Sequence, residues 1–189
     1  MYIQNYKLDN MSLISLLKED FHHAKKFRGK RVILLPEYHI TIFFRLASYF
    51  QNKFRLLYYP FNLCLLFLSY FTGIQIKPGC KIGGGLRFAH FSCIVIAGST
   101  TIGKNCSIMQ GVTCGCTHHG AKKGAPIIGD DCILCAGAKL IGHIHVGNNV
   151  VIGANSVVVD DVPDNCIVAG IPAKIIKTNV IIKNEIERY

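Results

Sequence analysis

The sequence predicts a parallel β-solenoid preceded by a helical region, and two observations lead to this prediction. Through most of the stretch from Ile76 to about Pro172 an apolar residue recurs every six positions, often followed by glycine, as in Ile152-Gly153. The first 75 residues instead place apolar residues at helical spacing. A period of six fits neither a helix nor an isolated strand, and it suits a short strand plus a turn repeated around a coil.

The recurring apolar positions, here called anchors, hold their phase over most of the solenoid. Three six-residue units make a triangular rung of about eighteen residues, and stacked rungs bury one apolar column that a single rung could not bury. A two-residue slip between Ile94 and Ile96 is interpreted as a small adjustment at a corner. Four positions after an anchor the residue is usually small or aliphatic and is predicted to point inward, as at Ser92. The anchors are Ile76, Ile82, Phe88, Ile94, Ile96, Ile102, Ile108, Cys114, Ile128, Leu134, Leu140, Val146, Ile152 and Val158.

The preceding region is expected to form three helices. Asn10 or Ser12 can cap a first helix that runs toward Arg28-Gly29, and Pro36 can occupy the first turn of a second. A third, strongly apolar segment covers Leu56 to Ile74, with Gly73 as its stop. We expect this segment to cap the first rung or to enter a subunit interface. The second alternative is an interfacial helix on a membrane surface, and the third is a membrane span.

Composition narrows the classes of function. The net charge of +10 would favour nucleic acid, but no aromatic residues interleave with a basic stripe in the solenoid, so no nucleic-acid partner is expected. Nothing at the N-terminus reads as a cleavable signal, and a cytoplasmic protein is expected, with the inner face of the membrane as the alternative location. Of the nine cysteines, Cys80, Cys106, Cys132 and Cys114 fall at column positions, so structural filling is favoured and no metal is expected.

The motif Ile152-Gly153-Ala154-Asn155-Ser156-Val157-Val158, followed by Ala169-Gly170-Ile171-Pro172-Ala173-Lys174, resembles the hexapeptide-repeat acyltransferases. Within that superfamily, Gly73 to Lys174 is similar to serine acetyltransferases and their relatives that acetylate sugars. The resemblance implies a left-handed parallel β-helix, acetyl-CoA as co-substrate, and a homotrimer with the cofactor groove between neighbouring coils. The expected domains are a helical region over 1–75, the acyltransferase β-helix over 76–174 and a tail over 175–189.

Acyl transfer to a hydroxyl needs a base near the hydroxyl proton and donors for the oxyanion, and histidine suits the base. His90 stands two positions after anchor Phe88, so its side chain should point outward at a corner. It also matches the catalytic histidine of the serine acetyltransferases. We therefore predict His90 as the general base. The alternative is an exposed corner histidine without a role.

The residues around His90 depart from the family pattern. Gln75 stands where the family has an aspartate that orients the histidine, and glutamine cannot stabilise an imidazolium by charge. Ala89 replaces an acidic residue, and Gly124-Ala125 replaces an Arg-His pair that reads the substrate. Groups that would hold an amino acid carboxylate are thus missing, which favours a neutral hydroxyl such as that of a sugar.

An excursion loop over 115–127 breaks the period, and loops on a rigid coil often carry ligand contacts. Its His118 and His119 are candidates for acceptor binding or for the missing partner of His90, or they are ordinary loop residues. His143 and His145 are expected at the surface. By resemblance, coenzyme A would lie against Thr117, Ala136 and Ala154, with Lys174 near its far end, while Cys116 replaces the usual glycine.

The leading prediction is an acetyl-CoA-dependent O-acetyltransferase that acts on a sugar hydroxyl in surface polysaccharide biosynthesis. Serine O-acetylation in cysteine biosynthesis is the alternative within the same class. Two other classes stay open: a zinc lyase similar to the γ-type carbonic anhydrases, and a solenoid without catalytic activity. The spacing of the histidines matches the zinc lyase poorly.

Overall fold

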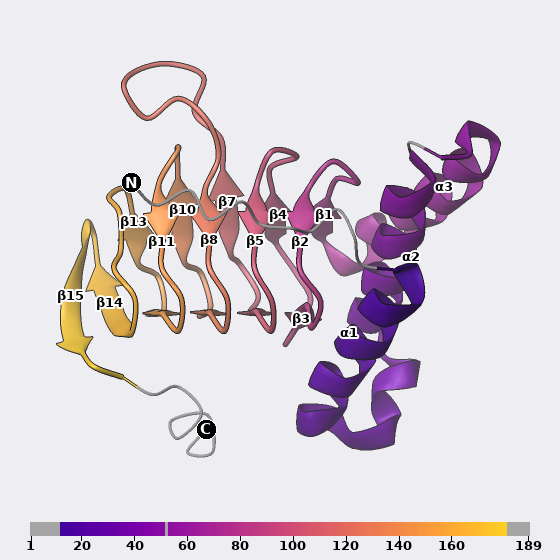
Figure 1. Cartoon of the computed structure of the whole chain (residues 1–189), viewed down its shortest axis with the longest axis horizontal. Helices are drawn as coiled ribbons and strands as arrows, with labels where there is room; N and C mark the ends of the chain where they lie inside the picture. Colours follow the sequence, from indigo (N-terminus) through magenta and orange to yellow (C-terminus); the bar gives the residue numbers. More distant parts are fainter. Residues whose placement is uncertain (1–11, 52, 181–189) are drawn as a thin grey trace.

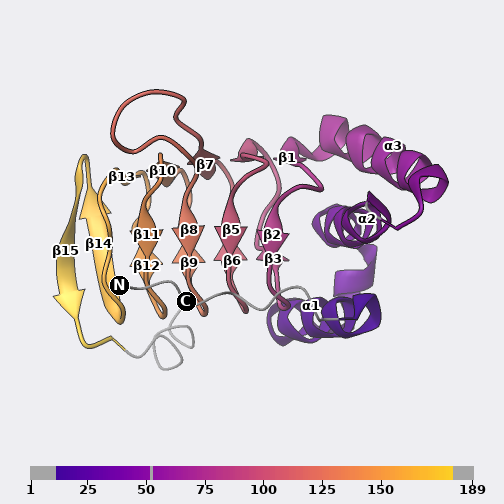
Figure 2. The same ribbon diagram turned by 45° about the horizontal axis from the view of Figure 1, so that its top comes forward.

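The computed structural model describes residues 12–51 and 53–180, in which a helical region packs against one end of a parallel β-solenoid (Figure 1). The helical region contains α1 (Leu13–Arg28), the short 3-10 helix η1 (Gly29–Leu34), α2 (Pro36–Gln51) and α3 (Arg55–Thr72). Figure 2 shows the helices gathered at the end of the coil that carries the first strands, far from the last ones.

The helix ends follow the sequence signals. The Ser12 hydroxyl accepts a hydrogen bond from the Ser15 amide at 3.1 Å and caps α1. Pro36 opens α2, where a missing amide proton costs nothing. Gly73 takes a left-handed conformation with φ of 66° and ends α3, as expected from its lack of a side chain. Asn10, the other candidate cap, lies outside the described residues.

The solenoid is built from short strands that form three parallel faces, followed by a final antiparallel strand. The faces run in the orders β1-β4-β7-β10-β13, β11-β8-β5-β2 and β15-β14-β12-β9-β6-β3. The strands are β1 Ile74–Ile76, β2 Lys81–Ile82, β3 Arg87–Phe88, β4 Ile94–Ile96, β5 Thr101–Ile102, β6 Ser107–Ile108, β7 Thr113–Gly115, β8 Ile127–Ile128, β9 Ile133–Leu134, β10 Lys139–Ile141, β11 His145–Val146, β12 Val151–Ile152, β13 Val157–Val158, β14 Cys166–Gly170 and β15 Ala173–Thr178.

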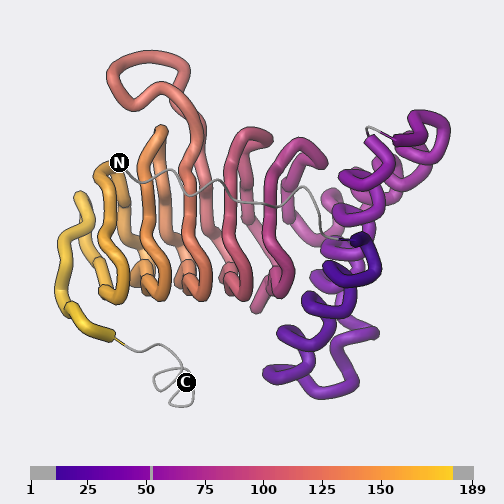
Figure 3. Tube along the Cα trace, in the orientation of Figure 1, coloured from indigo at the N-terminus to yellow at the C-terminus, as the bar shows by residue number. Residues whose placement is uncertain are grey.

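The predicted apolar column is present, which confirms the solenoid. Every anchor is buried, with at most 5% of its surface exposed. Ile152 lies directly over Leu134, and Leu134 over Ile108, so identical positions of successive rungs stack. The tube in Figure 3 shows these rungs as successive stacked turns, one of which carries a long projecting loop. Burial raises the pKa of Cys80 to about 11 and that of Cys114 to about 12, so these thiols stay protonated and fill space in the column.

The glycine after an anchor has a steric cause. A Cβ on Gly129 would lie 2.6 Å from the carbonyl oxygen of Gly147 on the next rung. The rungs approach so closely at this corner that only glycine fits. The repeated glycine therefore sets the spacing between rungs on this side of the coil.

The two-residue slip is not where the sequence pattern placed it. Ile94 pairs with Ile74 and Ile96 with Ile76, so both lie on one strand with their side chains in the column. The two additional residues lie earlier, in the corner between β3 and β4. There Ser92 has a φ of 103° and is exposed, so the expectation of an inward serine is wrong. The first rung is thus wider at this one corner, which also carries His90.

A buried ion pair fastens the helical region to the solenoid. Arg45 of α2 binds Asp20 of α1 at 2.8 Å, and both side chains are almost completely buried. The same guanidinium donates to the carbonyl oxygens of Ile82 and Gly83, each at 2.6 Å. The Asp20 carboxylate in turn accepts from the Leu86 amide at 2.8 Å. Two helices and the first rung therefore share one network, whose charges are paired and hydrogen-bonded as burial demands.

Helix α3 covers the start of the coil and leaves an apolar face open. Leu65 is buried in the common core, whereas Leu63, Phe67 and Tyr70 on the other side are exposed. Among the described residues, no helix is both long enough and apolar enough to cross a membrane.

Candidate active site

His90 lies in the widened corner between β3 and β4, where the sequence places it. Its side chain is exposed, and Phe88 just before it points into the column. Nδ1 of the ring lies 3.4 Å from Nη2 of Arg28, which also donates to the Ala89 carbonyl oxygen at 3.0 Å. Within the described residues Nε2 has no hydrogen-bond partner, so this nitrogen is open to a ligand.

The strand register brings two of the predicted cofactor residues, Ala136 and Ala154, onto the same corner as His90. Phe88, Ile108, Leu134 and Ile152 stack in neighbouring strands. Two positions after each of the last three come Gln110, Ala136 and Ala154, and the Asn155 amide donates to the Ala136 carbonyl oxygen at 2.8 Å. Ala154 is thus about 14 Å from the rung of His90, at about 4.8 Å per rung. The alanines leave backbone accessible along this edge.

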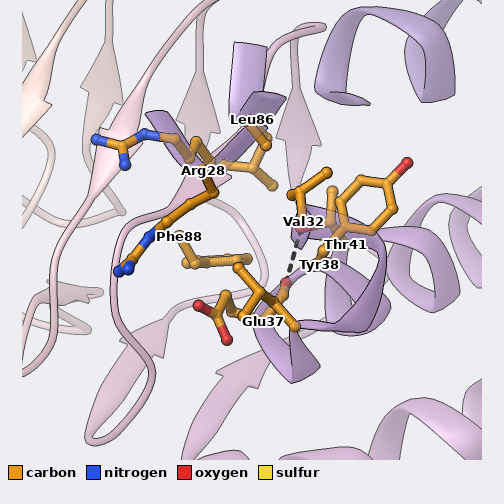
Figure 4. Close-up of a pocket in the computed structure, with 10 residues that line it drawn as sticks. Arg28, Val32, Glu37, Tyr38, Thr41, Leu86 and Phe88 are labelled. Carbon is orange, nitrogen blue, oxygen red and sulfur yellow. Dashed lines mark hydrogen bonds between the residues drawn. The ribbon is translucent and has the colours of Figure 1, made fainter. Parts of the chain in front are cut away.

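A hollow of about 340 Å³ adjoins His90, and the helical region forms its other wall. Its lining consists of Arg28, Leu35, Pro36, Glu37, His90 and Phe91. A second, narrow cavity of about 10 Å³, about the size of one water, shares Arg28, Leu35 and Glu37 with it. Figure 4 shows that cavity, with the Glu37 carboxylate directed toward the Phe88 side and the Tyr38 ring directed away.

Glu37 is the unusual member of this lining. It belongs to the first turn of α2, where the positive end of the helix dipole favours a carboxylate. Only 7% of the residue is exposed, and Oε2 has no hydrogen-bond partner among the described residues. Leaving a buried carboxylate oxygen without a donor costs free energy.

The other candidates around His90 contribute less within one chain. Gln75 sits in the middle of β1 with its side chain exposed, and no hydrogen bond between the described residues joins it to His90. Ala89 is buried. Arg28 therefore brings a positive charge to the ring, where the family pattern would bring a carboxylate.

The excursion loop leaves the coil at a different corner. The loop connects β7 to β8, whereas His90 lies in the turn between β3 and β4. Within one chain, the loop residues Thr117, His118 and His119 are therefore at a different corner from His90. His118 and His119 are exposed, and the Thr117 hydroxyl donates to the Lys122 carbonyl oxygen at the loop base. Figure 1 shows the loop projecting from one edge of the coil.

Two features hold the base of this loop. Gly124 has a φ of 132°, and a Cβ there would lie 3.1 Å from that of His143, so a side chain at this position would be strained. Lys122 binds Asp160 in the turn after β13, at 2.5 Å. The Lys122 hydrogen bond and charge lower the pKa of the Asp160 carboxyl, with Lys174 of β15 acting in the same direction. His143 and His145 are exposed, as expected.

The comparisons with known proteins agree with this architecture. A family model described as bacterial transferase hexapeptide (six repeats) matches residues 125–160. A serine acetyltransferase of Staphylococcus aureus (strain Mu50 / ATCC 700699) is 49% identical over 108 residues, which is 57% of this chain and 51% of the relative. A solved serine acetyltransferase in complex with CoA has a TM-score of 0.77 and 31% identity, covering 89% of this chain and 71% of that one.

The chain belongs to the serine acetyltransferase family of hexapeptide-repeat transferases. A further member, the Neisseria gonorrhoeae serine acetyltransferase in complex with serine, has a TM-score of 0.74 and 28% identity, covering 90% of this chain and 71% of that one. The chain spans about half the length of the curated relatives it matches, 51% in the case above. Membership confirms the resemblance found in the sequence.

Sequence reasoning missed Arg28 and Glu37. Arg28 appears in the sequence only as one member of a basic cluster, and Glu37 only as the residue after a helix-starting proline. Each is about 50 to 60 positions from His90, so no local spacing connects them. The available signal was Glu37 itself, the acidic residue of the first turn of α2.

Proposed function

We propose that this protein is an acetyl-CoA-dependent O-acetyltransferase with His90 as its general base. The observation that carries the proposal is the common corner of the coil, where His90 is followed by Gln110, Ala136 and Ala154 on successive rungs. The alanines would let the pantetheine arm lie along the backbone and end at His90. Thr117 and Lys174 would contact the cofactor as in the family pattern.

The reaction needs one proton transfer and one exchange of bonds. His90 takes the proton from the acceptor hydroxyl while the oxygen attacks the thioester carbonyl carbon, and general-base catalysis of this kind contributes about 10²- to 10⁴-fold. The new C–O bond forms, the C–S bond breaks, and the proton passes to the coenzyme A sulfur. The products are an O-acetyl ester and free coenzyme A.

The acceptor that the comparisons support best is L-serine, which was the alternative in the sequence analysis. The similar proteins named above are serine acetyltransferases, and one of them binds serine. A sugar hydroxyl is the second candidate. It is favoured by Gly124 and Ala125, which supply no charge at the loop positions that read the substrate in the family pattern.

The remaining partners are proposals of the same kind. We place the enzyme in the cytoplasm, as a homotrimer in which the loop of one chain reaches the His90 corner of the next. His118 and His119 would then approach an acceptor from the neighbouring chain. The apolar face of α3 would contact another subunit or the inner face of the membrane.

Thiol release from acetyl-CoA, measured with L-serine or with a panel of sugars and cell glycan, tests the proposal. His90→Ala should slow transfer by about 10²- to 10⁴-fold, because water cannot replace a positioned base. His145→Ala removes an exposed histidine of β11 and should leave the rate unchanged. If only a glycan supports turnover, the acceptor is a sugar hydroxyl and not serine. A transfer rate that is insensitive to His90→Ala would overturn the proposal.

A further inference from the structure

The exposed face of α3 is more apolar than the face that packs on the protein. Every exposed residue of α3 after Arg55 is apolar or aromatic. The polar residues lie on the packed side, where Asn62 and Ser69 are half-buried and Thr72 is buried. A surface helix in contact with water normally has the opposite arrangement. The exposed residues are Leu56, Leu57, Tyr59, Pro60, Leu63, Cys64, Leu66, Phe67, Tyr70 and Phe71.

Helical geometry gathers these side chains on one side of α3. Leu63, Phe67 and Tyr70 follow one another at intervals of four and three residues, so they form a stripe along the helix, here called the α3 stripe. The opposite side is filled by α2, where Phe61 stacks on Phe50 with ring centroids 5.4 Å apart. Figure 2 shows α2 between α1 and α3, which leaves the other side of α3 uncovered. A continuous exposed apolar surface of this kind marks a site of interaction.

The exposed charges of the helical region are of one sign. In its described residues, 12–51 and 53–72, the acidic residues Glu19, Asp20 and Glu37 are all buried or half-buried. Further along the chain, the sequence has no acidic residue between Glu37 and Asp130. The helical region thus presents positive charge together with apolar surface. Its exposed basic residues are Lys18, Lys25, Lys26, Arg28, Lys30, Arg31, Lys53 and Arg55.

Two of these basic residues lie at the start of α3 itself. Arg55 opens the helix, and its Nε donates a hydrogen bond to the Tyr59 hydroxyl on the exposed face at 3.2 Å. Lys53 lies over the ring of Tyr49 in α2, 4.2 Å from its centroid. Tyrosine and long basic side chains are suited to the headgroup level of a bilayer, because they combine an apolar body with a polar end.

We propose that α3 lies flat on an anionic phospholipid surface, with the α3 stripe inserted at the headgroup boundary and Lys53 and Arg55 among the lipid phosphates. Charge decides between the possible occupants of this face. A second copy of the chain would bring the same exposed cations to the contact, whereas an anionic bilayer neutralises them. Binding of this kind requires neither acetyl-CoA nor an acceptor, so the inference does not depend on the proposed function.

Co-sedimentation with vesicles of phosphatidylglycerol and phosphatidylcholine in equal parts tests the proposal, with vesicles of phosphatidylcholine alone for comparison. The unmodified protein should bind the anionic vesicles more tightly, and added salt should weaken that binding. The double variant Leu63→Gln, Phe67→Gln should lower the partition coefficient by about 10- to 100-fold, because two inserted apolar side chains are lost. Arg55→Gln should lower it by about 5-fold at low salt.

Two matched variants control for general losses of apolar surface and charge. Ile176 of β15, at the far end of the coil, is 64% exposed against 67% for Leu63, and Ile176→Gln should leave vesicle binding unchanged. Lys123→Gln removes one exposed positive charge from the excursion loop and should also have no effect. All the replaced side chains are exposed, so the far-UV circular dichroism spectrum and the urea midpoint should be the same in every variant.

The proposal is wrong if the unmodified protein binds both kinds of vesicle equally, or if the double variant binds anionic vesicles as tightly as the unmodified protein. A second copy as the occupant would appear as a lower mass of the double variant in sedimentation velocity without lipid, together with no vesicle binding by the unmodified protein. Thiol release from acetyl-CoA, measured without vesicles, should be unchanged in the double variant. Failure of vesicle binding would therefore leave the acetyltransferase proposal intact.

Discussion

At the scale of single residues, His23 shows how the joint between helices and coil depends on pH. His23 belongs to α1, and its Nδ1 contacts the Gly85 carbonyl oxygen of the first rung. Desolvation by burial lowers the pKa of His23, the hydrogen bond to Gly85 opposes this, and the charges of Arg87 and Lys26 lower the pKa further. The neutral ring is therefore the form that the folded protein favours.

Stability should fall when the solution is acidified through the ordinary pKa of histidine, about 6.5. Because the folded pKa is lower, the unfolded chain takes up the proton first, and stability is lost until the pH drops below the folded pKa. Urea midpoints between pH 7 and pH 5 should thus decrease more in the unmodified protein than in His23→Gln. His22→Gln, an exposed neighbour on α1, should behave like the unmodified protein; an equal decrease in all three would refute this origin.

Asparagines at the corners are another residue-scale feature. Asn105, Asn149 and Asn165 each have a φ between 55° and 57°, a conformation that suits asparagine better than most residues. The Asn149 side-chain amide donates to the Asn165 side-chain oxygen on the next rung at 2.7 Å. These residues shape the turns and link successive rungs at the same time.

At the scale of elements, the Asp20–Arg45 pair decides whether the helices stay on the coil. Asp20→Ala should reduce the free energy of unfolding by about 3–5 kcal/mol, because Arg45 would remain buried without its counter-charge. Urea denaturation followed by far-UV circular dichroism measures the loss.

An exposed aspartate provides the matched control for this prediction. Asp160 pairs with Lys122 at the surface, where both groups are hydrated, so Asp160→Ala should change the urea midpoint little. Replacing both Asp20 and Arg45 by apolar residues should recover part of the loss, because no unpaired charge remains. An Asp20→Ala variant as stable as the unmodified protein would show that the network does not fasten the helices.

At the scale of the whole molecule, the candidate site residues lie at two different corners of the triangular coil. The His90 corner and the excursion loop belong to different edges, and a rigid coil cannot bring them together within one chain. A neighbouring copy could supply its loop, which is the physical reason for expecting an oligomer, and a trimer is what the resemblance to the hexapeptide-repeat acyltransferases implies.

Sedimentation velocity should give a mass near three times 20.9 kDa. Binding of coenzyme A should strengthen the assembly, since a ligand that contacts two chains favours the associated state. A monomer at every concentration tested, with full activity, would contradict the division of the site. Co-sedimentation with anionic vesicles would show in addition whether the exposed face of α3 binds lipid instead of a subunit.

The sequence by itself determined the solenoid, the column of anchors, the ends of the helices and the outward position of His90. These features depend on local periodicity and on residues such as Pro36 and Gly73, whose backbone preferences act within a few positions. Only the tertiary structure decided that the wide corner lies at Ser92 and that Arg28 and Glu37 stand beside His90. It also decided that the buried Arg45 side chain connects the helices to the first rung. Such pairs lie 25 or more positions apart and meet because helices pack on a coil, an arrangement that no short spacing in the chain encodes.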